Sequence, residues 1–104
     1  MSQRLAMLDK LIAKGSADPF VYYARALELQ TAGQLDDALS AFEDVRRRFA
    51  GYVPTYLMAG QLAARLGQVE TSRSFLRQGI DVATAADDAH AQSELETALR
   101  SLPG

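Results

Sequence analysis

Two short stretches, Gly33-Gln34-Leu35-Asp36 and Gly67-Gln68-Val69-Glu70, carry the same pattern of side chains and lie 34 residues apart. The same spacing relates Tyr22 to Tyr56, which lie well outside these stretches. A fixed period of this length is typical of proteins that stack copies of one small structural unit. We therefore predict two tandem repeats, at residues 19–52 and 53–86.

Each repeat is predicted to contain two helices. Apolar side chains recur at steps of three and four between Pro19 and Thr31, which is the spacing of one helical face. Asp18 can cap the first free N–H groups, and Pro19 suits a first turn where no N–H partner exists. Gly33 can end the helix in the left-handed conformation. The six predicted helices span about residues 3–14, 19–31, 36–49, 54–66, 70–85 and 88–102.

The composition is that of an ordinary globular protein. The chain has 104 residues, of which 48% are hydrophobic and 23% charged. This length corresponds to one domain, and the apolar fraction is sufficient for a core. No alternating run of β-branched residues predicts a strand, so we expect an all-α fold.

Several classes of function are not expected from this composition. The net charge is −2, which gives no basic field for nucleic acid, and cysteine is absent. No run approaches the roughly 20 apolar residues that cross a membrane. The first residues carry no apolar leader, so we expect a cytoplasmic location without membrane contact.

The motifs within the two units resemble the tetratricopeptide repeat family. That pattern has an aromatic residue, then leucine and a small residue three and four positions further on, then tyrosine, later Ala-x₃-Phe and a closing proline, which is absent here at Ala50 and Thr84. Arg25 and Ala63 depart from it, since the family prefers leucine and an aromatic residue there. The matching segments are Tyr22-x₂-Arg25-Ala26-x₂-Leu29 with Ala38-x₃-Phe42, and Tyr56-x₂-Ala59-Gly60-x₂-Ala63 with Ser72-x₃-Leu76.

The resemblance implies a right-handed superhelix of antiparallel helix pairs that forms a single domain over residues 1–104. The N-terminal helix, within 1–16, would be the second half of a truncated repeat. The segment 87–104 would be the first half of a third repeat. Both would cap the array with a polar outer face. In this register His90 falls 34 residues after Tyr56.

The resemblance also implies a concave groove that binds a peptide or a helix of a partner protein. The first helix of each repeat would line this groove, which we expect to be largely apolar. As an alternative, the C-terminal helix covers these residues as ordinary core. The predicted groove residues are Phe20, Tyr23, Ala24, Leu27, Gln30, Leu57, Met58, Gln61 and Arg65.

Two other uses of the surface remain open in the sequence. An exposed apolar surface could instead be the interface of a homodimer, and partners could bind the convex side. No nucleophile motif, phosphate-binding loop or cofactor motif is present, so we predict neither catalytic residues nor a cofactor.

Three charged features are candidate sites. His90, Asp87 and Glu94 have the spacing of one helical face, but a histidine in an aromatic position fits better than a metal site. Arg25 is expected to pair with Glu28 or a nearby acid, with its stem along the helix. The run Arg46-Arg47-Arg48 is explained by the negative end of a helix dipole rather than by nucleic acid.

Overall fold

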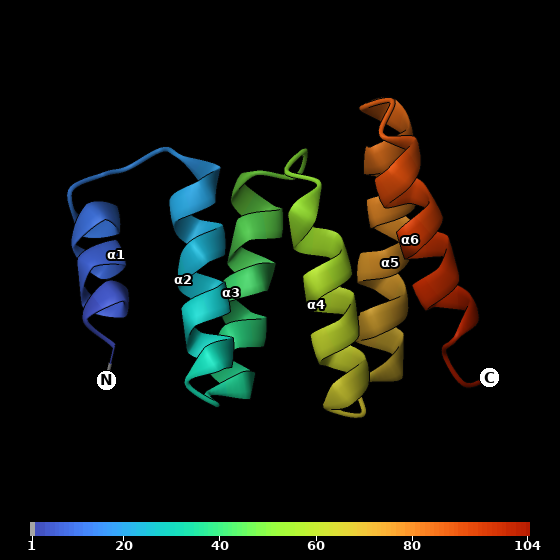
Figure 1. Ribbon diagram of the computed structural model, residues 1–104, viewed down its shortest axis with the longest axis horizontal. Coiled ribbons are helices and arrows are strands. Elements are labelled where there is room, and N and C mark those ends of the chain that lie inside the picture. Colours follow the sequence, from blue (N-terminus) through green and yellow to red (C-terminus); the bar gives the residue numbers. More distant parts are fainter. Residues whose placement is uncertain (1) are drawn as a thin grey trace. The chain divides into compact units, whose positions relative to one another are not determined.

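The computed structural model describes residues 2–104, and Met1 lies outside the described residues. Within 2–104 the chain forms six α-helices and no strand (Figure 1), which confirms the predicted all-α fold. Residues up to Phe49 form one compact unit, and residues from Ala50 form a second. The helices are α1 (Gln3–Ala13), α2 (Pro19–Thr31), α3 (Leu35–Arg48), α4 (Pro54–Arg65), α5 (Val69–Ala85) and α6 (Ala89–Arg100).

The predicted ends of α2 are present. The side chain of Asp18 accepts a hydrogen bond from the backbone N–H of Phe20 at 2.9 Å, and Pro19 occupies the first turn. Gly33 follows the helix with φ +80°. Glycine reaches this left-handed conformation without a side-chain clash.

We predict that Asp18→Ala will lower the free energy of unfolding by about 0.5–2 kcal/mol. The change removes the capping acceptor and leaves the N–H of Phe20 without its partner. Urea denaturation followed by circular dichroism measures the loss. Asp36→Ala is the matched control, since α3 has no side-chain cap bond and Asp36 is exposed in its first turn. Equal losses in the two variants would argue against a capping role for Asp18.

The two repeat tyrosines have equivalent surroundings. Tyr22 is buried and its hydroxyl donates to the carbonyl of Ser16, while Tyr56 is buried and donates to the carbonyl of Ala50. In both cases the acceptor lies six residues earlier. The repeat period therefore reflects repeated packing, not chance.

Small side chains lie where the paired helices of each repeat approach one another. In the first unit Ala26 and Ala38 are fully buried within the packed pair α2 and α3. In the second unit Ser72 of α5 donates its hydroxyl to the carbonyl of Gly60 on α4 at 2.6 Å. A Cβ atom at Gly60 would lie 2.5 Å from Leu76, so only glycine fits without movement.

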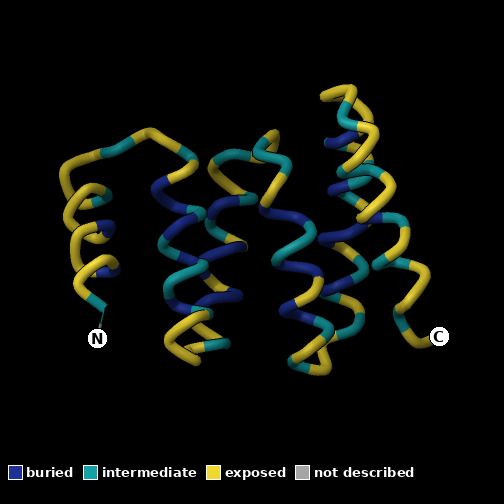
Figure 2. Tube along the Cα trace, viewed as in Figure 1, coloured by how far each residue is buried: buried dark blue, intermediate teal, exposed yellow. Residues whose placement is uncertain are grey.

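The outermost helix of each unit packs by an apolar face. In the first unit Leu8 of α1 packs with Val21 and Ala24 of α2, and Ile12 lies against this cluster. In the second unit α6 packs against α5 and α4, and Leu95 is buried close to Gly79. Figure 2 shows the buried side of α1 turned toward α2.

Candidate functional site

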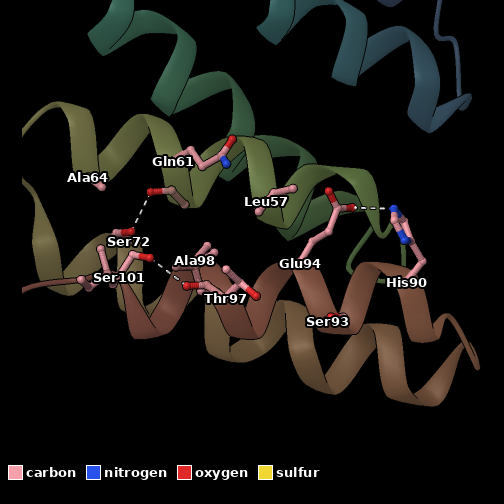
Figure 3. A pocket seen from close by; sticks show the side chains of 13 residues that line it. Leu57, Gln61, Ala64, Ser72, His90, Ser93, Glu94, Thr97, Ala98 and Ser101 are labelled. Atoms are coloured by element: carbon pink, nitrogen blue, oxygen red, sulfur yellow. Dashed lines mark hydrogen bonds and ion pairs between the residues drawn. The ribbon is translucent and has the colours of Figure 1, made fainter.

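An open cleft lies within the second unit, between α4 and α6 (Figure 3). Its volume is about 550 Å³, and residues of α5 form its base. We call it the α4–α6 cleft. It is lined by Leu57, Gly60, Gln61 and Ala64 of α4, Ser72 and Leu76 of α5, His90, Ser93, Glu94, Thr97 and Ala98 of α6, and the following Ser101 and Leu102.

The two walls of the cleft differ in chemistry. The α4 wall is mostly small or apolar, whereas the α6 wall carries Ser93, Thr97 and the carboxylate of Glu94. Among the residues that the structure describes, no lysine or arginine lines the cleft. The surface is therefore mixed in polarity, and less apolar than the predicted groove.

The side chains of His90 and Glu94 meet at the cleft. The Nε2 atom of His90 lies 3.3 Å from a carboxylate oxygen of Glu94, one helical turn further along α6. Within residues 2–104 no three histidine, cysteine or acidic side chains are grouped as metal ligands would be.

The expected position of His90 was wrong. Its side chain is 87% exposed, whereas the equivalent Tyr56 is fully buried. The buried residue of α6 is Leu95, which lies on a different side of the helix from His90.

The arginines considered as sites from the sequence have partners inside the first unit. Arg25 pairs with Asp9 of α1 rather than with Glu28. Arg48 pairs with Asp44, and its guanidinium lies over the ring of Tyr22 at 5.3 Å from the centroid. A cation over an aromatic face is stabilising, so this arginine has a structural role.

Two of the predicted groove residues of α4 lie on the α4–α6 cleft. Leu57 and Gln61 line it, whereas Met58 is half-buried and Arg65 is exposed outside its lining. Sequence reasoning thus identified part of one wall.

The predicted groove residues of α2 lie in different surroundings within the first unit. Phe20 is 51% exposed, and Tyr23 is half-buried with its ring against Phe42. Ala24 is only 2% exposed, because it packs against Leu8 of α1. Ala24 therefore belongs to the core and not to an open groove. Leu27 and Gln30 are half-buried.

Sequence reasoning missed the wall of the cleft that α6 provides. Its residues recur at steps of three and four from His90 to Ser101, beside the apolar stripe that contains Leu95. That spacing was a visible signal of a shared helical face. It did not reveal which helix the face would meet. α6 packs against α4 and leaves a cleft beside Leu57 and Gln61.

Solved structures of other proteins resemble this chain closely. A tetratricopeptide repeat domain protein from Salinibacter ruber is 34% identical in its crystal structure, with a TM-score of 0.73, over 79% of this chain and 91% of that one. The chain belongs to the tetratricopeptide repeat family. The solution structure of the Salinibacter protein agrees, with a TM-score of 0.75 over 79% of this chain and 83% of that one, again at 34% identity.

A third solved structure has the same fold at a lower sequence identity. The solution structure of a Bordetella parapertussis protein is 19% identical, with a TM-score of 0.78, and covers 96% of this chain and 87% of its own. This similarity concerns the fold alone. No family model matches the chain, and no curated protein sequence matches it.

Tetratricopeptide repeat domains in general mediate interactions between proteins and are typically not catalytic. Fold alone does not select a partner, so the role of this tetratricopeptide repeat chain must be argued from its surfaces. Among residues 2–104, none of the helices combines the length and the apolar character that crossing a membrane requires.

Proposed function

We propose that this chain is a non-catalytic interaction module that binds a segment of a partner protein in the α4–α6 cleft. The observation that carries the proposal is the open space of about 550 Å³ between two helices of a fold whose relatives are repeat domains. Clefts of roughly 300–1,000 Å³ are the usual size of binding sites for small groups.

The size of the cleft limits what enters it. One turn of a helix, about 10–12 Å across and 5.4 Å long, occupies roughly 420–610 Å³. The cleft, at about 550 Å³, therefore receives about one helical turn or a short extended segment. The partner would be anchored by a few residues rather than along a long helix.

The polarity of the walls suggests how such a segment is held. Ala64 has a small side chain, which allows the partner's backbone to approach that end of α4 closely. Leu57 and Leu102 offer apolar contact, and the hydroxyl of Ser93 offers a hydrogen bond at the rim. Apolar burial would supply the affinity, and the polar rim would set the register. On α2, the residues Phe20, Tyr23, Leu27 and Gln30 remain a proposed contact surface of the first unit.

The proposal is tested by filling the cleft. Ala98 lines it, and Ala98→Phe places a ring in the space that the partner would occupy. Peptides selected on the unmodified protein from a displayed random library should bind this variant about tenfold more weakly or worse, a loss of about 1.4 kcal/mol. Isothermal titration calorimetry measures the affinity, and circular dichroism verifies that the helices persist.

Ala89→Phe provides the control, because Ala89 is exposed on α6 outside the cleft lining. This variant should bind the selected peptides as the unmodified protein does. If Ala98→Phe binds equally well, the cleft is not the binding site. Sedimentation velocity on the same samples tests the homodimer alternative, which requires the mass to double with rising concentration.

A further inference from the structure

We propose that the outer face of α1, formed by Met7, Lys10, Leu11 and Lys14, is a docking surface for an acidic amphipathic helix of another protein. The surface lies in the first unit and is independent of the α4–α6 cleft. Its expected partner has an apolar stripe flanked by aspartate or glutamate.

The four residues share one side of the helix. They are spaced at steps of three and four, which places them in a single row along the helix surface. The adjoining side of α1 carries Leu8 and Ile12, which pack against α2. Figure 2 shows exposed residues along the side of α1 that faces away from α2.

Two large apolar side chains on this face are exposed. Met7 is 55% and Leu11 40% exposed, and one helical turn separates them. A cap of a helical repeat is expected to have a polar outer face, so α1 does not fit the cap that the sequence predicted. Adjacent exposed apolar side chains are typical of binding surfaces, and methionine adapts readily to a partner.

The charge of the face selects the kind of partner. Lys10 and Lys14 are exposed and form no ion pair within residues 2–104. The acid of α1, Asp9, is already paired with Arg25, and Arg4 is paired with Glu28. The outer face is therefore positive, although the chain as a whole has a net charge of −2. Complementary charge favours an acidic partner and disfavours a basic one.

The same charges argue against other occupants. A symmetric dimer through this face would bring the lysines of one copy against those of the other. An anionic membrane would attract two lysines only weakly, at about 1 kcal/mol each, and α1 offers two exposed apolar side chains for insertion. A helix of about three turns matches the 11 residues of α1 and can meet both apolar and charged positions.

The test uses a synthetic helical peptide of about three turns, with two leucines four residues apart and glutamates on both sides of them. The control peptide has lysine in place of every glutamate. Fluorescence anisotropy with the full chain should show binding of the acidic peptide alone. The affinity should fall as salt rises from about 0.01 to 1 M, since the Debye length falls from about 30 to 3 Å.

Two double variants of the chain test the apolar and the charged residues of the surface separately. Met7→Ser with Leu11→Ser removes the apolar contacts, and Lys10→Glu with Lys14→Glu reverses the charge. Each should weaken binding of the acidic peptide by about tenfold or more. The double reversal Arg65→Glu with Arg77→Glu is the control. It changes the net charge by the same amount as the lysine reversal, at exposed positions of α4 and α5. The affinity for the acidic peptide should remain unchanged.

Several results would overturn the proposal. The proposal is wrong if the acidic peptide does not bind, or if both peptides bind equally well. It is also wrong if Arg65→Glu with Arg77→Glu weakens binding as much as Lys10→Glu with Lys14→Glu does. Self-association abolished by Leu11→Ser would indicate a second copy as the occupant, and binding only to anionic vesicles would indicate a membrane. The variant Ala98→Phe should bind the acidic peptide as the unmodified protein does. The proposal for the outer face of α1 and the proposal for the α4–α6 cleft can therefore fail separately.

Discussion

Replacing Phe42 with alanine should lower the free energy of unfolding by about 3–5 kcal/mol. The ring of Phe42 is fully buried in the first unit and packs against Tyr23, with the ring centroids 6.1 Å apart. Without the ring, the free energy gained by burying it away from water is lost. The substitution also leaves a cavity that the helix pair cannot fully close. A small protein is stable by only about 5–15 kcal/mol, so the loss is a large part of the total.

Urea denaturation monitored by circular dichroism at several temperatures provides the measurement. Phe20→Ala is the matched control, because the ring of Phe20 is 51% exposed and contributes less to the core. The control should change the stability by roughly 0.5 kcal/mol or less, as surface substitutions usually do. Similar losses in both variants would mean that Phe42 is not a central core residue.

The second large effect is expected at Gly79, where Gly79→Ala should destabilise the second unit by a net amount of about 1–3 kcal/mol. A Cβ atom there would overlap the Cβ of Tyr56 and lie 3.0 Å from Leu95. Alanine normally favours a helix over glycine by about 1 kcal/mol. We expect the overlap to outweigh this gain, because the atom that must give way belongs to the base of a fully buried side chain.

Thermal and urea denaturation of Gly79→Ala test this expectation. Gly51→Ala is the control, since a Cβ atom at Gly51 would meet open space. An increase in stability at Gly79 would show that α4, α5 and α6 can separate without cost. Because these helices form the α4–α6 cleft, the selected peptides should also bind Gly79→Ala more weakly than the control.

The helices of this protein were predictable because local chemistry sets their ends. Asp18 caps α2 through its own side chain, and Gly33 and Gly67 take the left-handed conformation that ends α2 and α4. The pairing of helices was also predictable, since Tyr22 and Tyr56 recur with the repeat and fill equivalent buried positions. These features depend on residues that are close in the sequence or related by its period.

The candidate site was only partly predictable. Leu57 and Gln61 were expected on the groove side of α4 and line the cleft. The lining residues of α6 were not named as part of the site, and Ala24 was placed on a surface that α1 covers.

The sequence by itself determined an all-α chain of paired helices, because helical spacing and capping act over a few residues. Tertiary structure alone decided which side of α6 is buried, because the 34-residue spacing points to His90 whereas the packed helices bury Leu95. It also decided that α1 buries Leu8 and leaves Leu11 exposed, since both belong to the apolar side that the sequence predicts and only the neighbouring helix distinguishes them.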